Sequence, residues 1–150
     1  MMLKSKISIR EPVFVDTWGW IALGHRRDLR HTEVKRIFQE LRHHRISIYT
    51  SDYVLDELIT LLFRREVFYE ATRFIDGTWA AADLTHVQIE RVTSDCFSAA
   101  WELRKRFQDK PRISFTDLTS MIIMKERGIR QVLTGDEHFI HVGMGFSKFP

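Results

Sequence analysis

Four acidic side chains are the residues of this chain best placed to do chemistry. Each lies in apolar surroundings, just after a predicted strand or in an opening turn of the helix that follows one; they are Asp16, Glu57, Asp117 and Asp136. Carboxylates gathered at one edge of a sheet repel each other and need a cation to hold them together. Mg²⁺ and Mn²⁺ prefer carboxylate and water oxygens and are common agents of phosphodiester cleavage. The pattern therefore predicts a metal-dependent nuclease.

Each acid also has an ordinary structural explanation. An acidic side chain near a helix start stabilises the helix by about 0.3–1 kcal/mol through the helix dipole. Taken alone, Asp16 or Asp117 is better explained as a cap, and Asp136 could close a turn. Glu57 follows Asp56 in a helix with apolar neighbours, so at least one of these two acids approaches the buried stripe. The hypothesis rests on the conjunction, because four independent coincidences at one sheet edge are improbable.

Short apolar runs alternate with helical patterns along the chain and must position these acids. Strands are predicted at residues 12–15, 46–49, within 84–92, 131–134 and 145–149. Helices are predicted at residues 18–23, 31–43, from a cap at 50–51 to 62, 67–81, 93–107 and 115–127. This order indicates right-handed crossovers and a parallel sheet with both faces covered. Ligands of such α/β sheets bind beyond the carboxyl ends of the strands, where all four acids can meet.

The composition predicts a single domain. Of the 150 residues, 44% are hydrophobic and 29% are charged, and the lone Cys96 falls in a helical pattern as a small core residue. No stretch approaches the roughly 20 apolar residues of a membrane span, and the N-terminus lacks the apolar run of a signal peptide. We therefore expect a cytoplasmic protein without membrane association. The net charge of +3 permits a polyanionic partner without requiring one.

Four motifs occur in a fixed order. They are Val13-Phe14-Val15-Asp16-Thr17, Thr50-Ser51-Asp52-Tyr53-Val54-Leu55-Asp56-Glu57, Ser114-Phe115-Thr116-Asp117-Leu118-Thr119-Ser120 and Leu133-Thr134-Gly135-Asp136-Glu137-His138-Phe139. Any one is weakly specific, but the ordered set resembles the PIN domain family, and within it the VapC-type ribonuclease toxins and their free-standing relatives. The resemblance implies a three-layer α/β/α fold with a central parallel sheet of four to five strands. Residues 12–150 are then the PIN domain and residues 1–11 an N-terminal tail.

The resemblance also implies an activity and partners. The acidic quartet of the family corresponds to Asp16, Glu57, Asp117 and Asp136, which would hold Mg²⁺ or Mn²⁺ and hydrolyse RNA. The three aspartates would bind metal directly or through water, and Glu57 would be a ligand or orient the attacking water. An RNA substrate, an antitoxin protein and a homodimer formed through the helices after Glu57 are implied as well. Trp18 departs from the family pattern, where a small hydroxyl residue is frequent, and could narrow substrate access or pack on the sheet.

Other groups suggest weaker sites. His138 and His141 lie about one helical turn apart, but no cysteine or acid completes a zinc pattern, so structural or solvent roles are favoured. Arginine clusters occur at Arg26-Arg27, Arg42 to Arg45, Arg64-Arg65 and Arg104-Lys105-Arg106. Most are expected at solvated helix ends, and some could bind an RNA backbone. Trp101 is expected on a buried helical stripe. A phosphatase or a receiver domain is disfavoured, because this chain lacks further residues that those proteins require: Trp18 stands where such phosphatases have a second aspartate, and the paired acids and the lysine of a receiver are not evident. The main alternative function is a catalytically silent PIN-like module that binds RNA or protein, which retention of all four acids disfavours.

Overall fold

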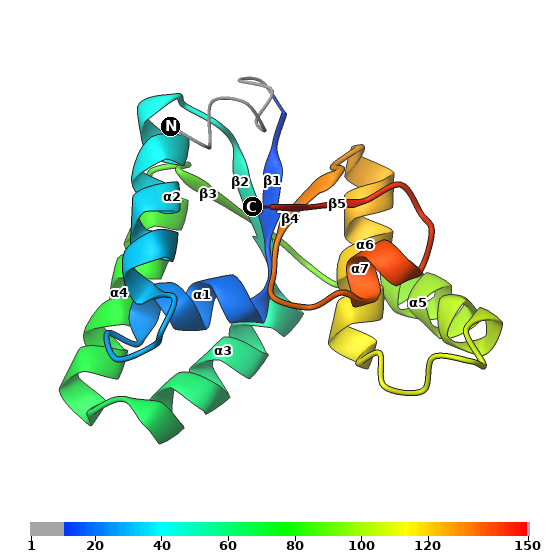
Figure 1. The fold of residues 1–150 in the computed structure, drawn as a ribbon, viewed down its shortest axis with the longest axis horizontal. Coiled ribbons are helices and arrows are strands. Elements are labelled where there is room, and N and C mark those ends of the chain that lie inside the picture. The colour runs from blue at the N-terminus through cyan, green and yellow to red at the C-terminus, as the bar shows by residue number, and fades with distance from the viewer. Residues whose placement is uncertain (1–10, 150) are drawn as a thin grey trace.

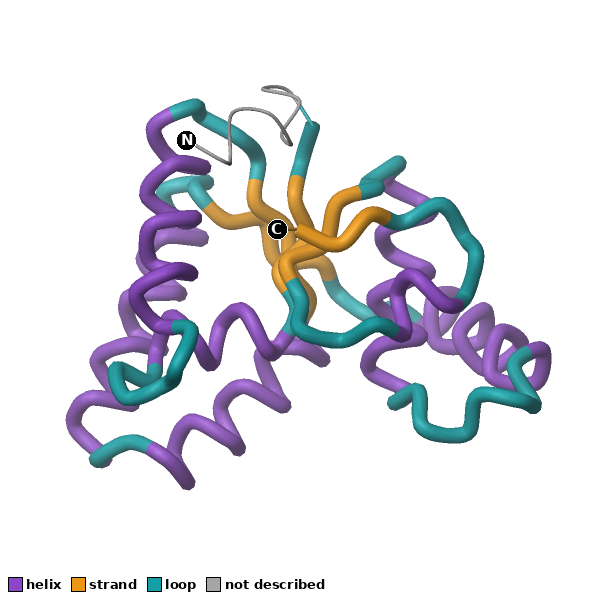
Figure 2. Tube along the Cα trace, viewed as in Figure 1, coloured by secondary structure: helices purple, strands orange, loops and turns teal. Residues whose placement is uncertain are grey.

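A parallel β-sheet forms the centre of the molecule in the computed structural model, which describes residues 11–149 (Figure 1). Its strands, drawn in orange in Figure 2, are β1 (Val13–Val15), β2 (Ile48–Ser51), β3 (Val87–Glu90), β4 (Gln131–Leu133) and β5 (Ser147–Phe149). Their order is β3-β2-β1-β4-β5, and every neighbouring pair is parallel. The predicted parallel sheet is confirmed with five strands.

Seven helices in the described part of the chain cover the sheet. They are α1 (Thr17–Gly24), α2 (His31–His43), α3 (Asp52–Arg65), α4 (Phe68–Asp83), α5 (Ser94–Arg106), α6 (Phe115–Arg127) and α7 (His138–His141). Figure 1 shows α1 to α4 on one side of the sheet and α5 to α7 on the other. The strand order reverses between β1 and β4, which is the position where α/β sheets bind ligands.

Local caps explain several helix bounds. Ser114 Oγ accepts a hydrogen bond of 3.0 Å from the backbone N–H of Asp117, and Gly128 ends α6 with a φ of 67°. Ser51 Oγ accepts from the backbone N–H of Val54 at 3.1 Å, at the start of α3. These caps place an acidic residue in an early turn of each helix, close to the sheet edge.

The core confirms most, but not all, of the expected burial. The three residues of β1 are fully buried, as expected for a central strand covered on both faces, and Cys96 is buried. Trp101 was expected on a buried stripe, and that expectation is wrong, because its side chain is 53% exposed. The buried residues of α5 are Cys96, Ala100 and Leu103, and Cys96 Sγ lies 3.9 Å from the backbone oxygen of Thr119 in α6, whereas Trp101 is not among the buried residues of the helix.

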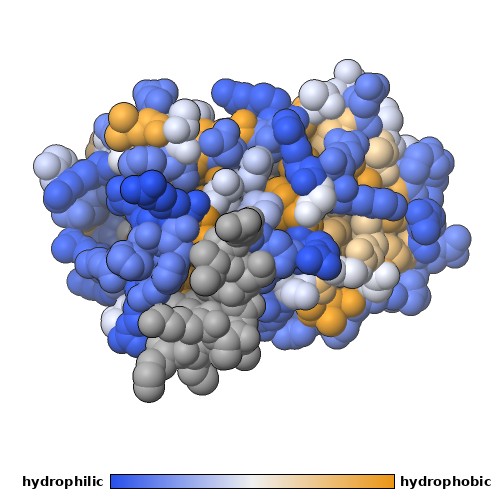
Figure 3. All heavy atoms as spheres, turned by 90° about the horizontal axis from the view of Figure 1, so that it is seen from above, coloured by the Kyte–Doolittle hydropathy of each residue, from blue (hydrophilic) through white to orange (hydrophobic). Residues whose placement is uncertain are grey.

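The face seen from above is mainly hydrophilic, with separate apolar groups between the hydrophilic ones (Figure 3). Among the described residues, no helix combines the length and the apolar character needed to cross a membrane. The predicted tail, residues 1–11, lies outside the described residues except for Glu11, whose carboxylate is 2.8 Å from Arg130 Nε.

Candidate active site

All four predicted acids line one cavity of about 530 Å³. Asp16 directly follows β1, and Asp136 follows β4, its parallel neighbour in the sheet. Glu57 comes from α3 and Asp117 from the first turn of α6, so the two sides of the sheet each contribute one carboxylate. The predicted meeting of the four side chains at the carboxyl edge of the sheet is confirmed.

Asp16 is held in place by hydrogen bonds from both neighbouring segments. Its Oδ1 accepts from the backbone N–H of Thr17 at 2.8 Å, and its Oδ2 accepts from the Thr134 hydroxyl at 2.7 Å. The same Thr134 oxygen accepts from the backbone N–H of Asp136 at 3.0 Å. The Thr134 hydroxyl therefore links the two acids that follow β1 and β4, and it fixes the carboxylate of Asp16.

The carboxylates perturb one another in this buried setting. Burial raises the pKa of Asp117 to about 8, with further increases from the charges of Asp16, Asp136 and Glu57. Burial also raises the pKa of Asp16 to about 6, although its hydrogen bonds from Thr134 and Thr17 oppose the increase. Perturbation of this kind by desolvation and like charges is common at functional sites.

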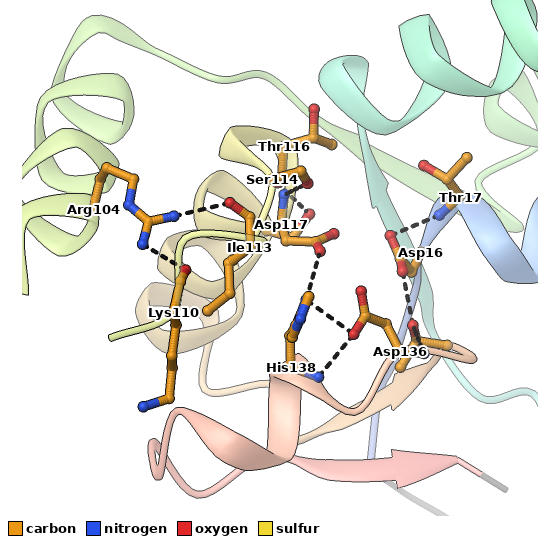
Figure 4. A network of polar contacts seen from close by, with 12 residues as sticks. Asp16, Thr17, Arg104, Lys110, Ile113, Ser114, Thr116, Asp117, Asp136 and His138 are labelled. Carbon is orange, nitrogen blue, oxygen red and sulfur yellow. Dashed lines mark hydrogen bonds and ion pairs between the residues drawn. The ribbon is translucent and has the colours of Figure 1, made fainter. Parts of the chain in front are cut away.

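His138 belongs to the site, although the sequence favoured a structural or solvent role. Its Nδ1 lies 3.0 Å from Asp136 Oδ1 and 4.0 Å from Asp117 Oδ2 (Figure 4). Its backbone N–H donates to the same Asp136 oxygen at 2.8 Å. One ligand atom from each of these three residues lies within 4.8 Å of the others, a spacing that suits a shared metal ion. The only sequence signal was its position two residues after Asp136.

The donor set fits a hard divalent cation. Within residues 11–149, no lysine or arginine forms an ion pair with any of the four carboxylates, and His138 is the one basic side chain paired with them. Thr17 lines the cavity, and its Oγ1 is buried and has no hydrogen-bond partner among the described residues. Oxygen-rich sites with uncompensated carboxylates are typical of Mg²⁺ and Mn²⁺.

Trp18 forms part of the cavity wall. Its indole lies so close to Gly135 that a Cβ at that glycine would collide with it, and the side chain also packs against the core. Trp18 thus both packs beside the sheet and borders the space that a substrate would enter. Gly135 is required here because it lets this indole approach the turn that carries Asp136.

The fold and the acid cavity together define a class of protein. The PIN domain family matches residues 13–144, and the chain belongs to this family. The chain is similar to the 23S rRNA-specific endonuclease VapC20 of Mycobacterium tuberculosis, with 37% identity over 134 residues, which cover 87% of this chain and 94% of that protein.

Solved structures support the same grouping. The crystal structure of VapC20 from Mycobacterium tuberculosis, described as a sarcin–ricin loop cleaving toxin, matches with a TM-score of 0.72 and 36% identity, over 87% of this chain and 95% of that chain. The VapBC2 complex of Rickettsia felis matches with a TM-score of 0.68 at 15% identity, over 91% of this chain and 96% of that chain. At that identity the second likeness shows the fold alone.

Proposed function

We propose that this protein is a divalent-metal-dependent endoribonuclease and the toxin of a toxin–antitoxin pair. The observation that carries the proposal is the convergence of four carboxylates in one cavity, none of which forms an ion pair with a lysine or arginine among the described residues. A polyanionic RNA would not enter such a cavity unless a cation reduced its negative charge. The similarity to an endonuclease that acts on 23S rRNA supports RNA as the substrate class.

Each residue of the site would have a separate role in metal binding or in cleavage. Asp16, Asp117 and Asp136 would hold Mg²⁺ or Mn²⁺, with His138 beside the latter two. A bound divalent ion supplies an activated water and neutralises charge that develops on the phosphate. Glu57 would be a further ligand or accept a hydrogen bond from the attacking water and orient it. Thr134 keeps Asp16 in position, and the Thr17 hydroxyl offers an oxygen beside it.

The sarcin–ricin loop of 23S rRNA is the first substrate to test, because the similar VapC20 structure is described as cleaving that loop. A ribosomal target would place the protein in the cytoplasm. The decisive experiment incubates the pure protein with an end-labelled RNA hairpin containing this loop, in Mg²⁺, Mn²⁺ or EDTA. We expect cleavage at one position with either metal and none in EDTA.

A matched pair of variants separates the site from general acidity. Glu57→Gln removes a cavity carboxylate, whereas Asp56→Asn changes the preceding residue, which is exposed and does not line the cavity. We expect Glu57→Gln to lose cleavage by at least about a hundredfold, since it removes a group that acts in the transition state, and Asp56→Asn to retain it. RNA binding without cleavage by the wild type in either metal would favour the silent binding module instead.

A second cavity supports the antitoxin partner. It measures about 630 Å³ and lies between α1, α2 and α4, with Trp20, Phe38 and Phe74 among its apolar lining. Its basic residues outnumber its one acid, and they are Arg26, His31, Lys35, Arg42, Arg73 and His86. An amphipathic antitoxin segment with acidic and apolar side chains would complement it. Lys35→Glu with Arg73→Glu should release a co-expressed antitoxin, and retention of the complex would refute this placement.

An exposed apolar surface at the junction of α3 and α4 supports a homodimer. Val67, Phe68 and Tyr69 are all exposed there, and the ring of Phe68 is 5.3 Å from that of Phe63. Large exposed apolar groups of this kind mark association surfaces. Phe68→Glu should convert the protein to a monomer in analytical ultracentrifugation. An unchanged mass, or a wild type that is already monomeric, would refute this dimer.

A further inference from the structure

Two arginines border the acid cavity from opposite sides of the sheet. Arg65 is the last residue of α3, and with Glu57 and Leu61 of the same helix it lines the cavity. Arg112 lies in the loop between α5 and α6, on the other side (Figure 1). Both side chains are exposed, and neither forms an ion pair with a described residue. Two guanidinium groups are thus available at the rim of a cavity whose interior is acidic.

The loop that carries Arg112 is held by one partly buried guanidinium group, that of Arg104. Arg104 Nη2 donates to the backbone oxygens of Phe107 at 2.6 Å and Lys110 at 2.7 Å, and its Nη1 donates to that of Ile113 at 2.9 Å. Figure 4 shows the two bonds to Lys110 and Ile113, which flank Arg112 in the chain. Arg104 lies in the last turn of α5, but it is an exception to the expectation that most of these arginines are solvated. Its side chain is partly buried and joins three carbonyls of one loop.

Only an arginine can make this set of contacts. The guanidinium has five donors in a planar fork, whereas a lysine has one ammonium nitrogen and cannot span three separated carbonyls. The loop continues directly into the Ser114 cap of α6, so it is fixed on both sides of Arg112. The contacts restrict the backbone of Arg112 without touching its side chain.

We propose that Arg65 and Arg112 bind the phosphates on either side of the scissile bond, and that Arg104 is the positioning residue of Arg112. This inference rests on the proposed RNA cleavage and deepens it. The acids would hold the metal ion at the scissile phosphate, but their negative charge repels the phosphates on either side of it. Arginines at the rim of the cavity offset that repulsion. A planar guanidinium suits bidentate contact with a phosphate group.

The test is a double-mutant cycle on the cleavage of the labelled hairpin. Arg112→Ala should raise KM about tenfold, as for the loss of a charged hydrogen bond, and leave kcat nearly unchanged. It should also make the slope of log affinity against log salt concentration less negative by about one, because one phosphate contact is lost. Arg104→Lys should raise KM similarly, and the double variant should be no worse than Arg112→Ala alone, because both changes remove the same contact. Arg106→Ala, an exposed neighbour outside the cavity, is the control and should leave KM unchanged.

Binding measurements keep this inference separate from the proposed function. In the Asp117→Asn background, RNA affinity is measured by fluorescence anisotropy without cleavage. Equal affinity with and without Arg112→Ala would overturn the phosphate contact, whether or not the wild type cuts the RNA. Multiplied effects of Arg104→Lys and Arg112→Ala, or an Arg104→Lys variant that does not fold, would overturn the positioning role and make Arg104 a general stabiliser. If the wild type binds RNA through Arg112 but does not cleave it, only the proposed nuclease activity would be overturned.

Discussion

The substitution Asp117→Asn should stabilise the metal-free protein, because it removes a carboxyl group whose charge is disfavoured in the folded state. Asp117 is only 8% exposed, and burial together with three other acids raises its pKa from 3.8 to about 8. In the unfolded protein the Asp117 carboxyl group loses its proton near pH 4, whereas in the folded protein its raised pKa keeps the proton until about pH 8. The folded state is therefore penalised progressively as the pH rises between these values, and fully above the higher one.

The size of the effect follows from the pKa difference. One pKa unit corresponds to about 1.4 kcal/mol, which sets an upper limit of about 5–6 kcal/mol above pH 8. An amide in the same place also loses hydration, so we expect a gain of roughly half that limit, on the order of 2–3 kcal/mol. Below pH 4 the gain should vanish, because the Asp117 carboxyl group is then protonated in both the folded and the unfolded protein.

Urea unfolding in EDTA at pH 4, 6 and 8.5 measures this gain, with the exposed Asp56→Asn as the control. Added Mg²⁺ should stabilise the wild type by mass action and the Asp117→Asn variant much less. A stability difference that does not depend on pH would refute the electrostatic reasoning. An Asp117→Asn protein that is less stable than the wild type at pH 8.5 would refute it as well.

Three further changes probe the surroundings of the site. Thr134→Val removes a hydrogen bond that lowers the pKa of Asp16, so the acidic limb of the pH–rate profile should move upward by about one pH unit; an unchanged limb would show that Asp16 does not control it. Gly135→Ala forces a Cβ into the indole of Trp18 and should cost about 1–3 kcal/mol in urea unfolding; recovery in a Trp18→Leu background is the check. Cys96 is buried and its thiol pKa is raised to about 11, so it should react with a thiol reagent only after unfolding; rapid labelling of the folded protein would contradict its place in the core.

Local sequence signals predicted the helix bounds better than the strand bounds. Helix α6 begins at the Ser114 cap and ends before Gly128, since both signals act within one turn of the chain. The second strand was predicted at residues 46–49 but occupies Ile48–Ser51, two residues later. Its bounds depend on pairing with β1 and β3, and a short apolar run carries no information on that register.

The sequence by itself determined the family, the parallel sheet and the four acids, because each rests on motifs or periodicities contained in short segments. Strand ends of a parallel sheet share one edge, so the meeting of Asp16, Glu57, Asp117 and Asp136 could be inferred without coordinates. Only the tertiary structure placed His138 beside two of these acids and Arg104 across three carbonyls of a loop. Such contacts depend on how loops and side chains pack in space, and the distances that define them are not encoded in the spacing of residues along the chain.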